Sequence, residues 1–458
     1  MNRLSLTNLP LAPAVDPNAL SVGIVHLGIG AFHRAHQAVV TERAAVATGE
    51  TRWGITGVSQ RSTTVRDQLA PQDGLYSVLE RGLGEPSIQV IGSVRDVLTA
   101  PEDPEAVVAR IADPAVSVVT LTVTEKGYRA AGDGLNLDDP EIQADLTGRP
   151  PRTVIGQLAA AIARRDEPLT ILSCDNLVAN GPFLRRLMTD YIEALGKVPP
   201  AFDGTRFPAG MVDRIVPATT EADRDDAARM LGVRDEAVVV AEPFLQWVIE
   251  DDFAGARPAW ERGGAVLTSD VAPWEQAKLR MLNATHSMLA YLGALRGYET
   301  IAEAVRDDEL GGLARRLMTE DVIPTLTAPD GLDLTAYGAT VLERFENPAL
   351  KHRTRQVAMD GSVKLPVRML GTVRDRLATG AEPEVISLAV AAWMVYVLRT
   401  PDLDDPQAAR LQTAVSGITD PAKLVDALRA VDTIFTPDLR DSDVFRGLLV
   451  NHVTALTR

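Results

Sequence analysis

The sequence predicts an α/β domain followed by a mostly α-helical domain. In the first two-thirds of the chain, short β-branched runs alternate with helical patterns, which is typical of a parallel sheet with crossover helices. From about Pro273 onward the β-rich runs stop and one helical pattern follows another. A chain of 458 residues is also too long for one ordinary core. We therefore expect two domains, 1–271 and 272–458, separated at the turn-forming segment SDVAP of residues 269–273.

The candidate strands of the first domain are short and rich in Val and Ile, at residues 22–27, 53–58, 88–91, 116–123, 169–173 and 237–241. Helical patterns between them cover residues 34–47, 105–112, 154–165 and 182–195. In the second domain we predict helices over residues 274–295, 301–305, 309–320, 334–345, 364–378, 385–398 and 421–431. The run at 385–398 is shorter than the roughly 20 apolar residues that span a bilayer, so we expect a buried helix there.

Charge and cysteine content limit the possible functions. The formal net charge of −16 opposes general attraction to nucleic acid or to an anionic membrane. The N-terminal segment has no apolar core of signal-peptide length. The one cysteine, Cys174, allows no internal disulfide and fits a reducing cytoplasm, and with six scattered histidines it argues against a zinc site. We therefore expect a cytoplasmic protein without a metal, nucleic-acid or membrane partner.

Residues 21–36 carry the cofactor signal, reading SVGIVHLGIGAFHRAH. In dinucleotide-binding folds the glycine at position 28 would make the tight turn, and Gly30 would let the backbone approach the pyrophosphate at a helix N-terminus. His33 occupies the third position, where a glycine normally allows the helix to pack closely on the strand. The alternative is a glycine-rich turn without a ligand. The position of this glycine segment at the start of the first βαβ unit favours cofactor binding.

Two further positions bear on the cofactor. Arg34, just inside the helix, either pairs with a phosphate or is an exposed charge. The second strand ends in Ser59-Gln60-Arg61, which offers no acid for the ribose 2′-hydroxyl of NAD, whereas Arg61 could accept the 2′-phosphate of NADP. These residues leave the choice between NAD and NADP open.

The helical pattern from residue 274 carries four polar side chains on one face. At about 100° per residue, Lys278, Glu275, His286 and Asn283 fall within half of the helix circumference. The alternative is a solvated face, but such faces are normally rich in charged pairs, and Asn and His gain little from helix propensity. We interpret the face as a site for alcohol oxidation. A partly desolvated lysine with a lowered pKa takes the hydroxyl proton, and asparagine amides bind the developing alkoxide.

Polar residues also follow other apolar runs, at the sheet edge where ligands bind in open α/β folds. Asn176, within SCDN, either supplies a second amide or forms part of a turn. Glu125 and Lys126 end another strand, where a cofactor or substrate would lie. Asp213 and Arg214 stand between apolar flanks, and from the residues alone we expect structural salt bridges there.

These segments resemble the polyol-specific long-chain dehydrogenases, the family of mannitol dehydrogenase and fructuronate reductase. The similar segments are, in chain order, GIVHLGIGAFHRAHQA, VVTLTVTEKGY, ILSCDNL, MVDRIVPAT, EPFLQWVIED, KLRMLNATHS and AMDGSVKLP. The resemblance implies a Rossmann-type N-terminal domain, a helical C-terminal domain, an active site between them and no metal. It favours NAD, and the cofactor-binding candidates are Gly28, Gly30, Phe32, Arg34 and Glu125.

The resemblance also implies catalytic roles. Lys278 corresponds to the general base, Asn176 and Asn283 to the oxyanion site, and His286 to a residue that orients substrate hydroxyls. Glu275 corresponds to a glutamate that connects the lysine to solvent protons. The substrate-binding candidates are Asp213, Arg353 and Lys364.

Details favour a sugar acid as substrate. Mannitol enzymes resemble EGGY where this chain has EKGY at residues 125–128, and they carry arginine where this chain has Gln356. A sugar-acid carboxylate needs a fixed cation, for which Lys126, Lys351 and Arg353 are candidates unless all three are surface charges. We therefore expect an NAD-dependent enzyme that interconverts D-mannonate and D-fructuronate. Oxidation of mannitol or arabinitol is the alternative, and a nucleotide sensor without turnover is a remote one.

Overall fold

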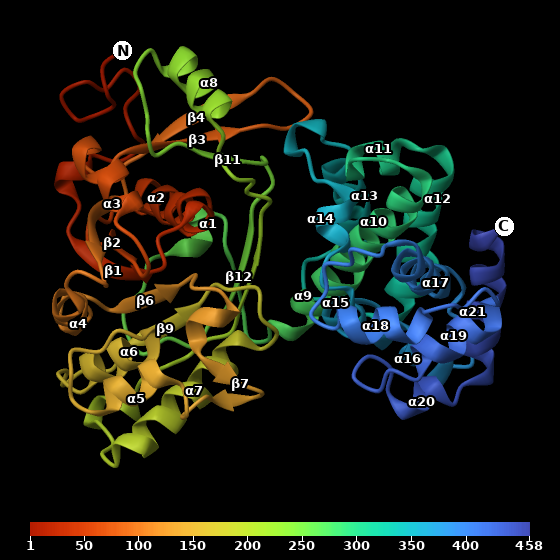
Figure 1. Ribbon diagram of the computed structural model, residues 1–458. Helices are drawn as coiled ribbons and strands as arrows, with labels where there is room; N and C mark the ends of the chain where they lie inside the picture. Colours follow the sequence, from red (N-terminus) through yellow and green to blue (C-terminus); the bar gives the residue numbers. More distant parts are fainter. The chain divides into compact units, whose positions relative to one another are not determined.

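The computed structural model describes residues 1–458 and divides into two compact units, Met1–Val271 and Ala272–Arg458. The first unit is built on a parallel sheet and the second is helical, so the predicted fold class is confirmed (Figure 1).

A five-stranded parallel sheet forms the centre of the first unit. Its strands are β1 (Val22–Leu27), β2 (Gly54–Ser59), β5 (Val94–Thr99), β6 (Val118–Leu121) and β9 (Thr170–Ser173), in the spatial order β5-β2-β1-β6-β9. Counted along the chain, this is the 3-2-1-4-5 order of a Rossmann-type sheet. The order reverses between β1 and β6, and ligands of such sheets bind beside the carboxyl ends of the strands at that point.

Helices and loops cover both faces of this sheet because its strands alternate apolar side chains to each side. Val25 and Leu27 join a buried cluster with α4 (Pro104–Ala112), α5 (Pro140–Leu146), α6 (Val154–Ile162) and α7 (Asn180–Leu195), which gather on one side of the sheet in Figure 1. Ile24 belongs to the cluster of the other face, with α2 (Gln37–Thr48), Trp247 and Trp260. The remaining helices of this unit are α1 (Ala31–Ala35), α3 (Thr64–Leu69) and α8 (Glu221–Leu231).

Two three-stranded sheets complete the first unit, together with the short hairpin β7 (Ala130–Ala131) and β8 (Gly134–Leu135). One sheet holds β10 (Gly210–Asp213), β12 (Gln246–Glu250) and β13 (Val266–Thr268), and the other holds β11 (Val239–Ala241), β3 (Tyr76–Glu80) and β4 (Ser87–Ile91). The strand predicted at 88–91 is therefore β4, but it pairs antiparallel with β3 outside the parallel sheet. The short connection between β3 and β4 is the reason, because parallel pairing needs a crossover of a dozen residues or more.

The second unit is a helical domain. The buried helix α17 (Glu384–Arg399) corresponds to the predicted run at 385–398 and packs against α10 (Ala284–Arg296) and α21 (Asp443–Thr457). None of the helices combines the length and the apolar character needed to cross a membrane. The other helices of this unit are α9 (Ala272–Ala277), α11 (Ile301–Arg306), α12 (Asp308–Arg316), α13 (Leu334–Phe345), α14 (Thr354–Ala358), α15 (Gly361–Leu365), α16 (Gly371–Ala378), α18 (Ala408–Val415), α19 (Pro421–Arg429) and α20 (Pro437–Arg440).

Several helices predicted as continuous are interrupted. The helices predicted at 274–295 and 364–378 each contain a π-helical segment, at Lys278–Asn283 and Pro366–Leu370, and the helix predicted at 309–320 runs into a third, Leu317–Val322. The first of these segments packs against the other two. The helix predicted at 34–47 breaks at His36, whose φ of −123° and ψ of −87° separate α1 from α2. A single π turn changes the apolar periodicity by one residue, which the sequence pattern did not reveal.

Candidate functional site

The turn after β1 is shaped for a close approach of two backbone segments. Gly28 has a φ of 95°, and a Cβ atom there would lie 2.2 Å from the carbonyl oxygen of Thr122. The position therefore requires glycine. A Cβ atom on Gly30 would meet nothing closer than 3.8 Å, so the protein leaves space beside this glycine. The space lies at the carboxyl end of β1, where dinucleotide-binding folds hold the pyrophosphate, and its binding by Gly28 and Gly30 stays a prediction.

A histidine pair takes the place of the third glycine of the fingerprint. The ring of His33 stacks on that of His26, with centroids 3.4 Å apart and an angle of 12° between the planes. His26 also bonds through Nδ1 to Thr120 Oγ1 at 2.7 Å and through Nε2 to Thr122 Oγ1 at 2.8 Å, while Thr122 Oγ1 donates to Gly28 O at 2.9 Å. The histidine pair thus connects α1, β1 and the glycine turn. Burial lowers the pKa of His26 to about 3 and the pKa of His33 well below its ordinary value, so both rings are neutral.

Arg34 is buried rather than exposed, so the exposed-charge alternative is wrong. Its Nε donates to Gly30 O at 3.2 Å, its Nη1 donates to Ala237 O, and its guanidinium carbon lies 5.6 Å from the ring centroid of Tyr76. These contacts hold the glycine turn in place from its buried side. Phe32 is half-buried and its ring stacks on that of His36 with centroids 5.0 Å apart. Cofactor binding by Arg34 and Phe32 stays a prediction.

Asp175 joins the carboxyl ends of β6 and β9. Its Oδ2 accepts hydrogen bonds from Val123 N at 3.0 Å and from Tyr128 Oη at 2.7 Å, and its Oδ1 accepts from Thr124 N at 2.9 Å. Thr124 has a φ of 65°, a strained backbone conformation for a β-branched residue. The carboxylate therefore holds a bent loop beside the catalytic candidate Asn176. Sequence reasoning proposed a role for Asn176, with a turn as the alternative, and missed this role of Asp175.

A pocket of ≈ 370 Å³ opens beside this carboxylate. Its lining includes three predicted site residues, Glu125, Lys126 and Asn176, so the structure brings these three together. Glu125 and Lys126 are exposed. The neighbouring thiol, Cys174, is buried at the end of β9, and burial raises its pKa. At the end of β2, Arg61 is exposed and Gln60 Nε2 donates to Gln157 Oε1 at 3.0 Å. Contact of Arg61 with a 2′-phosphate stays a prediction.

Asp213 lies at the end of β10, in a different sheet, and is buried. Its neighbour Arg214 forms the expected structural salt bridge, but with Glu80, at 2.5 Å. Arg214 also donates to the carbonyl oxygens of Ala35 and Glu242, so it connects the end of α1 with the two smaller sheets. Substrate binding by Asp213 stays a prediction.

In the second unit the catalytic candidates bracket a π turn. Lys278 is the first residue of the π segment, Asn283 is its last, and both are buried. Glu275 is buried three residues before Lys278, in α9, and His286 is in the first turn of α10. The guanidinium of Arg368 donates to the carbonyl oxygen of Asn283 at 3.4 Å and to Ser287 Oγ at 3.0 Å. The end of the π segment is therefore held by a half-buried cation.

Cations gather around His286. Its ring stacks with those of Phe345 and His352, whose centroids are 4.8 and 5.4 Å away, and its Nε2 has no hydrogen-bond partner. Burial lowers the pKa of His286 well below its ordinary value, and the nearby charges act in the same direction, with Arg368, Lys364 and Arg344 among them. Burial also lowers the pKa of Lys364, whose Nζ donates to Val357 O at 3.3 Å. The arrangement places a neutral histidine among cationic side chains.

Not every predicted cation belongs to this group. The side chains of Arg353 and Lys351 are exposed, and Arg353 contributes only backbone contacts to the start of α14 and to Thr300. Sequence reasoning missed Arg344 and Arg368. Arg368 had a signal, because it lies four residues after the predicted Lys364 and shares its helix face. No group of three or more His, Cys, Asp or Glu side chains is arranged to bind a metal ion.

Comparisons with known proteins cover nearly the whole chain. Residues 22–262 match the family model of the mannitol dehydrogenase Rossmann domain, and residues 270–457 match that of the mannitol dehydrogenase C-terminal domain. D-mannonate oxidoreductase of Escherichia coli (strain K12) is 41% identical over 461 residues, which is 96% of this chain and 94% of that protein. D-sorbitol dehydrogenase in substrate-free form has a TM-score of 0.92 and 32% identity, with 100% of this chain and 98% of that chain covered. The ternary complex of Pseudomonas fluorescens mannitol 2-dehydrogenase with NAD and D-mannitol has a TM-score of 0.84 and 36% identity, with 99% and 97% covered.

Proposed function

This chain belongs to the mannitol dehydrogenase family of oxidoreductases, and from that premise we propose that it interconverts D-mannonate and D-fructuronate with NAD as cofactor. Cofactor choice is supported by the space beside Gly30 and by the NAD in the mannitol 2-dehydrogenase complex. Substrate choice is supported by the 41% identity to D-mannonate oxidoreductase.

The proposal gives the residues of each unit a chemical role. Gly28, Gly30 and the loop at Glu125 hold the dinucleotide, whose nicotinamide supplies the hydride acceptor. Lys278 takes the proton from the alcohol hydroxyl, and Glu275 passes that proton toward solvent. The amides of Asn176 and Asn283 stabilise the developing alkoxide, and His286 orients a neighbouring hydroxyl through its free Nε2.

The observation that carries the sugar-acid assignment is the cationic group around His286. The ring of Phe345, the residue after Arg344, stacks on His286, and Arg368 donates to Asn283 O and Ser287 Oγ beside it. These two cations and Lys364 all lower the pKa of His286. Asp360 Oδ2 lies 3.8 Å from Lys364 Nζ and offsets part of this charge. A substrate carboxylate would pair with these cations in addition, and a neutral polyol cannot form such a charge-assisted pair.

The test is a comparison of kcat/KM for D-mannonate and D-mannitol, measured as NAD reduction. We expect D-mannonate to be favoured by about tenfold or more, since one charge-assisted pair contributes ~1.5–3 kcal/mol. Lys364→Gln should remove most of this preference while sparing D-mannitol, and Arg353→Ala tests the cation that the sequence predicted. Arg355→Ala, at an exposed arginine two residues after Arg353, is the matched control.

The outcomes separate the alternatives. Equal efficiency on the two substrates would contradict the sugar-acid assignment and support mannitol oxidation, which the D-mannitol complex of the 36% identical relative favours. NAD binding without reduction by any sugar acid or polyol would be the behaviour of a nucleotide sensor.

A further inference from the structure

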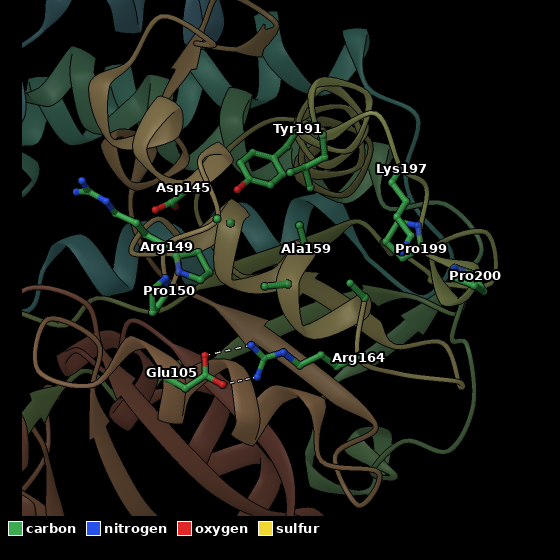
Figure 2. A pocket seen from close by; sticks show the side chains of 16 residues that line it. Glu105, Asp145, Arg149, Pro150, Ala159, Arg164, Tyr191, Lys197, Pro199 and Pro200 are labelled. Atoms are coloured by element: carbon green, nitrogen blue, oxygen red, sulfur yellow. Dashed lines mark hydrogen bonds and ion pairs between the residues drawn. The ribbon is translucent and has the colours of Figure 1, made fainter.

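A second pocket lies on the outer side of α6 and shares no residue with the site described above. Its volume is ≈ 500 Å³. The floor is the outward face of α6, which carries only Gly156, Ala159, Ala160 and Ala163. Figure 2 shows Pro150 on one side of this floor and Pro199 and Pro200 on the other. Small side chains and proline rings together make a flat, apolar slot between the helices that flank α6.

Tyr191 places a polar atom without a partner in this slot. The residue is 2% exposed, its ring lines the pocket from α7, and its hydroxyl forms no hydrogen bond with the protein. In Figure 2 the hydroxyl is on the side of Asp145. Asp145 is already satisfied, because it accepts from the backbone N–H groups of Arg152 and Thr153 at 2.9 Å each and from Thr153 Oγ1 at 2.6 Å. The hydroxyl oxygen is open to solvent in the slot, so it is available to bond a polar group of a ligand that enters there.

The charges at the rim are unbalanced toward the positive. Glu105 pairs with Arg164 through both carboxylate oxygens, the second contact being 3.1 Å long (Figure 2). Arg149 and Lys197 line the same pocket, are exposed, and have no carboxylate partner. Counting the carboxylate of Asp145, the lining still carries a net positive charge, although the chain as a whole has a net charge of −16. An anionic group on the ligand would meet these two cations.

We propose that this pocket binds an aromatic carboxylate that carries a polar substituent on its ring. The flat floor of α6 accepts the ring, the Tyr191 hydroxyl bonds the substituent, and Arg149 and Lys197 attract the carboxylate. A fatty acid fits less well, because its chain offers nothing to the Tyr191 hydroxyl. The proposal is independent of which sugar derivative the enzyme oxidises.

The experiment is titration calorimetry of the full chain with 4-hydroxycinnamate, with and without saturating NAD. Two matched compounds separate the contacts. The neutral amide of 4-hydroxycinnamate should bind about tenfold more weakly, because it loses the charge attraction, and cinnamate should bind about fivefold more weakly, because it lacks the ring hydroxyl. In Tyr191→Phe the difference between 4-hydroxycinnamate and cinnamate should disappear.

Two alanine replacements control for the location of the site. Ala163→Leu fills the slot at an exposed position of α6 and should abolish binding, whereas Ala222→Leu, at an exposed position of α8 outside the pocket, should leave it unchanged. Circular dichroism and dehydrogenase activity should match the parent in all three variants. No saturable binding up to about 10 mM overturns the proposal. Binding that NAD displaces, or that survives both Ala163→Leu and Tyr191→Phe, also overturns it, because the compound then occupies another site.

Discussion

Lys278 and Asn283 stand at the two ends of one π turn. In an α-helix, residues five positions apart point about 140° away from each other. A π turn closes i to i+5 hydrogen bonds, so it brings the two residues onto nearly the same side, one turn apart. The sequence analysis placed them on one face by assuming an α-helix. The π turn brings them closer than that assumption did, and single π turns of this kind are frequent at functional sites.

Replacement of Lys278 tests its role as the base. We expect Lys278→Ala to lower kcat by several orders of magnitude while the dissociation constant for NAD changes little, because only proton removal is lost. Turnover with the best substrate and fluorescence titration with NADH measure the two quantities. Lys351→Ala, at an exposed lysine of the same unit, should behave like the parent. Near-normal turnover in Lys278→Ala would assign the base to another residue.

The loop that follows β6 depends on one carboxylate. Asp175 holds two backbone N–H groups and one hydroxyl, and it thereby keeps Thr124 in its left-handed conformation. We expect Asp175→Asn to lower kcat/KM by about 10- to 100-fold, because an amide group cannot accept all three bonds and the loop beside Asn176 loosens.

Asp145→Asn is the matched control for this loop. Asp145 also accepts from two backbone N–H groups and one hydroxyl, but it lies in the slot of α6. Both variants should lower the melting temperature by several degrees, and only Asp175→Asn should change the kinetics. Equal kinetic losses in the two would show that Asp175 acts through stability alone.

The sequence predicted the bounds of an element correctly where a single pattern runs through that element. Strand β1 and helix α13 occur at the predicted bounds, because an apolar run or a strong helical period defines each from end to end. Strand β5 was missed, since Arg95 and Asp96 interrupt its apolar run, and an edge position in the sheet tolerates such polar residues. Sequence reasoning identified as one group the candidate site residues that share a motif. Arg344 and Asp175 were not, because tertiary contacts alone give them a role.

At the scale of the whole molecule, buried neutral histidines set a limit of stability in acid. Burial lowers the pKa of His26 to about 3 and those of His33 and His286 well below the ordinary value of 6.5. An unfolded chain protonates these rings below about pH 6.5, and the folded protein cannot. The free energy of unfolding is therefore fully retained above this pH and falls below it, by about 1.4 kcal/mol per histidine per pH unit.

Urea unfolding between pH 4 and pH 7 measures this loss. Glu42, whose pKa burial raises to about 7, opposes the histidines between its ordinary value of 4.5 and pH 7. A variant therefore isolates one ring. His33→Phe keeps an aromatic ring stacked on His26, but this ring takes up no proton. The free energy of unfolding of the variant should therefore fall less steeply as the pH is lowered, with a slope that corresponds to about one proton fewer. An unchanged slope would show that His33 is charged in the folded protein or neutral in the unfolded one.

The buried thiol at the end of β9 makes this chain convenient for site-specific labelling. Cys174 is 1% exposed, burial raises its pKa, and thiol reagents attack the exposed thiolate form. No native cysteine therefore has to be removed before a dye or spin label is attached. One cysteine introduced on the surface of each unit, for example at Ala222 and at Lys351, gives a doubly labelled protein with all catalytic candidates intact. Distances between the two labels can then be followed directly as NAD and sugar are added.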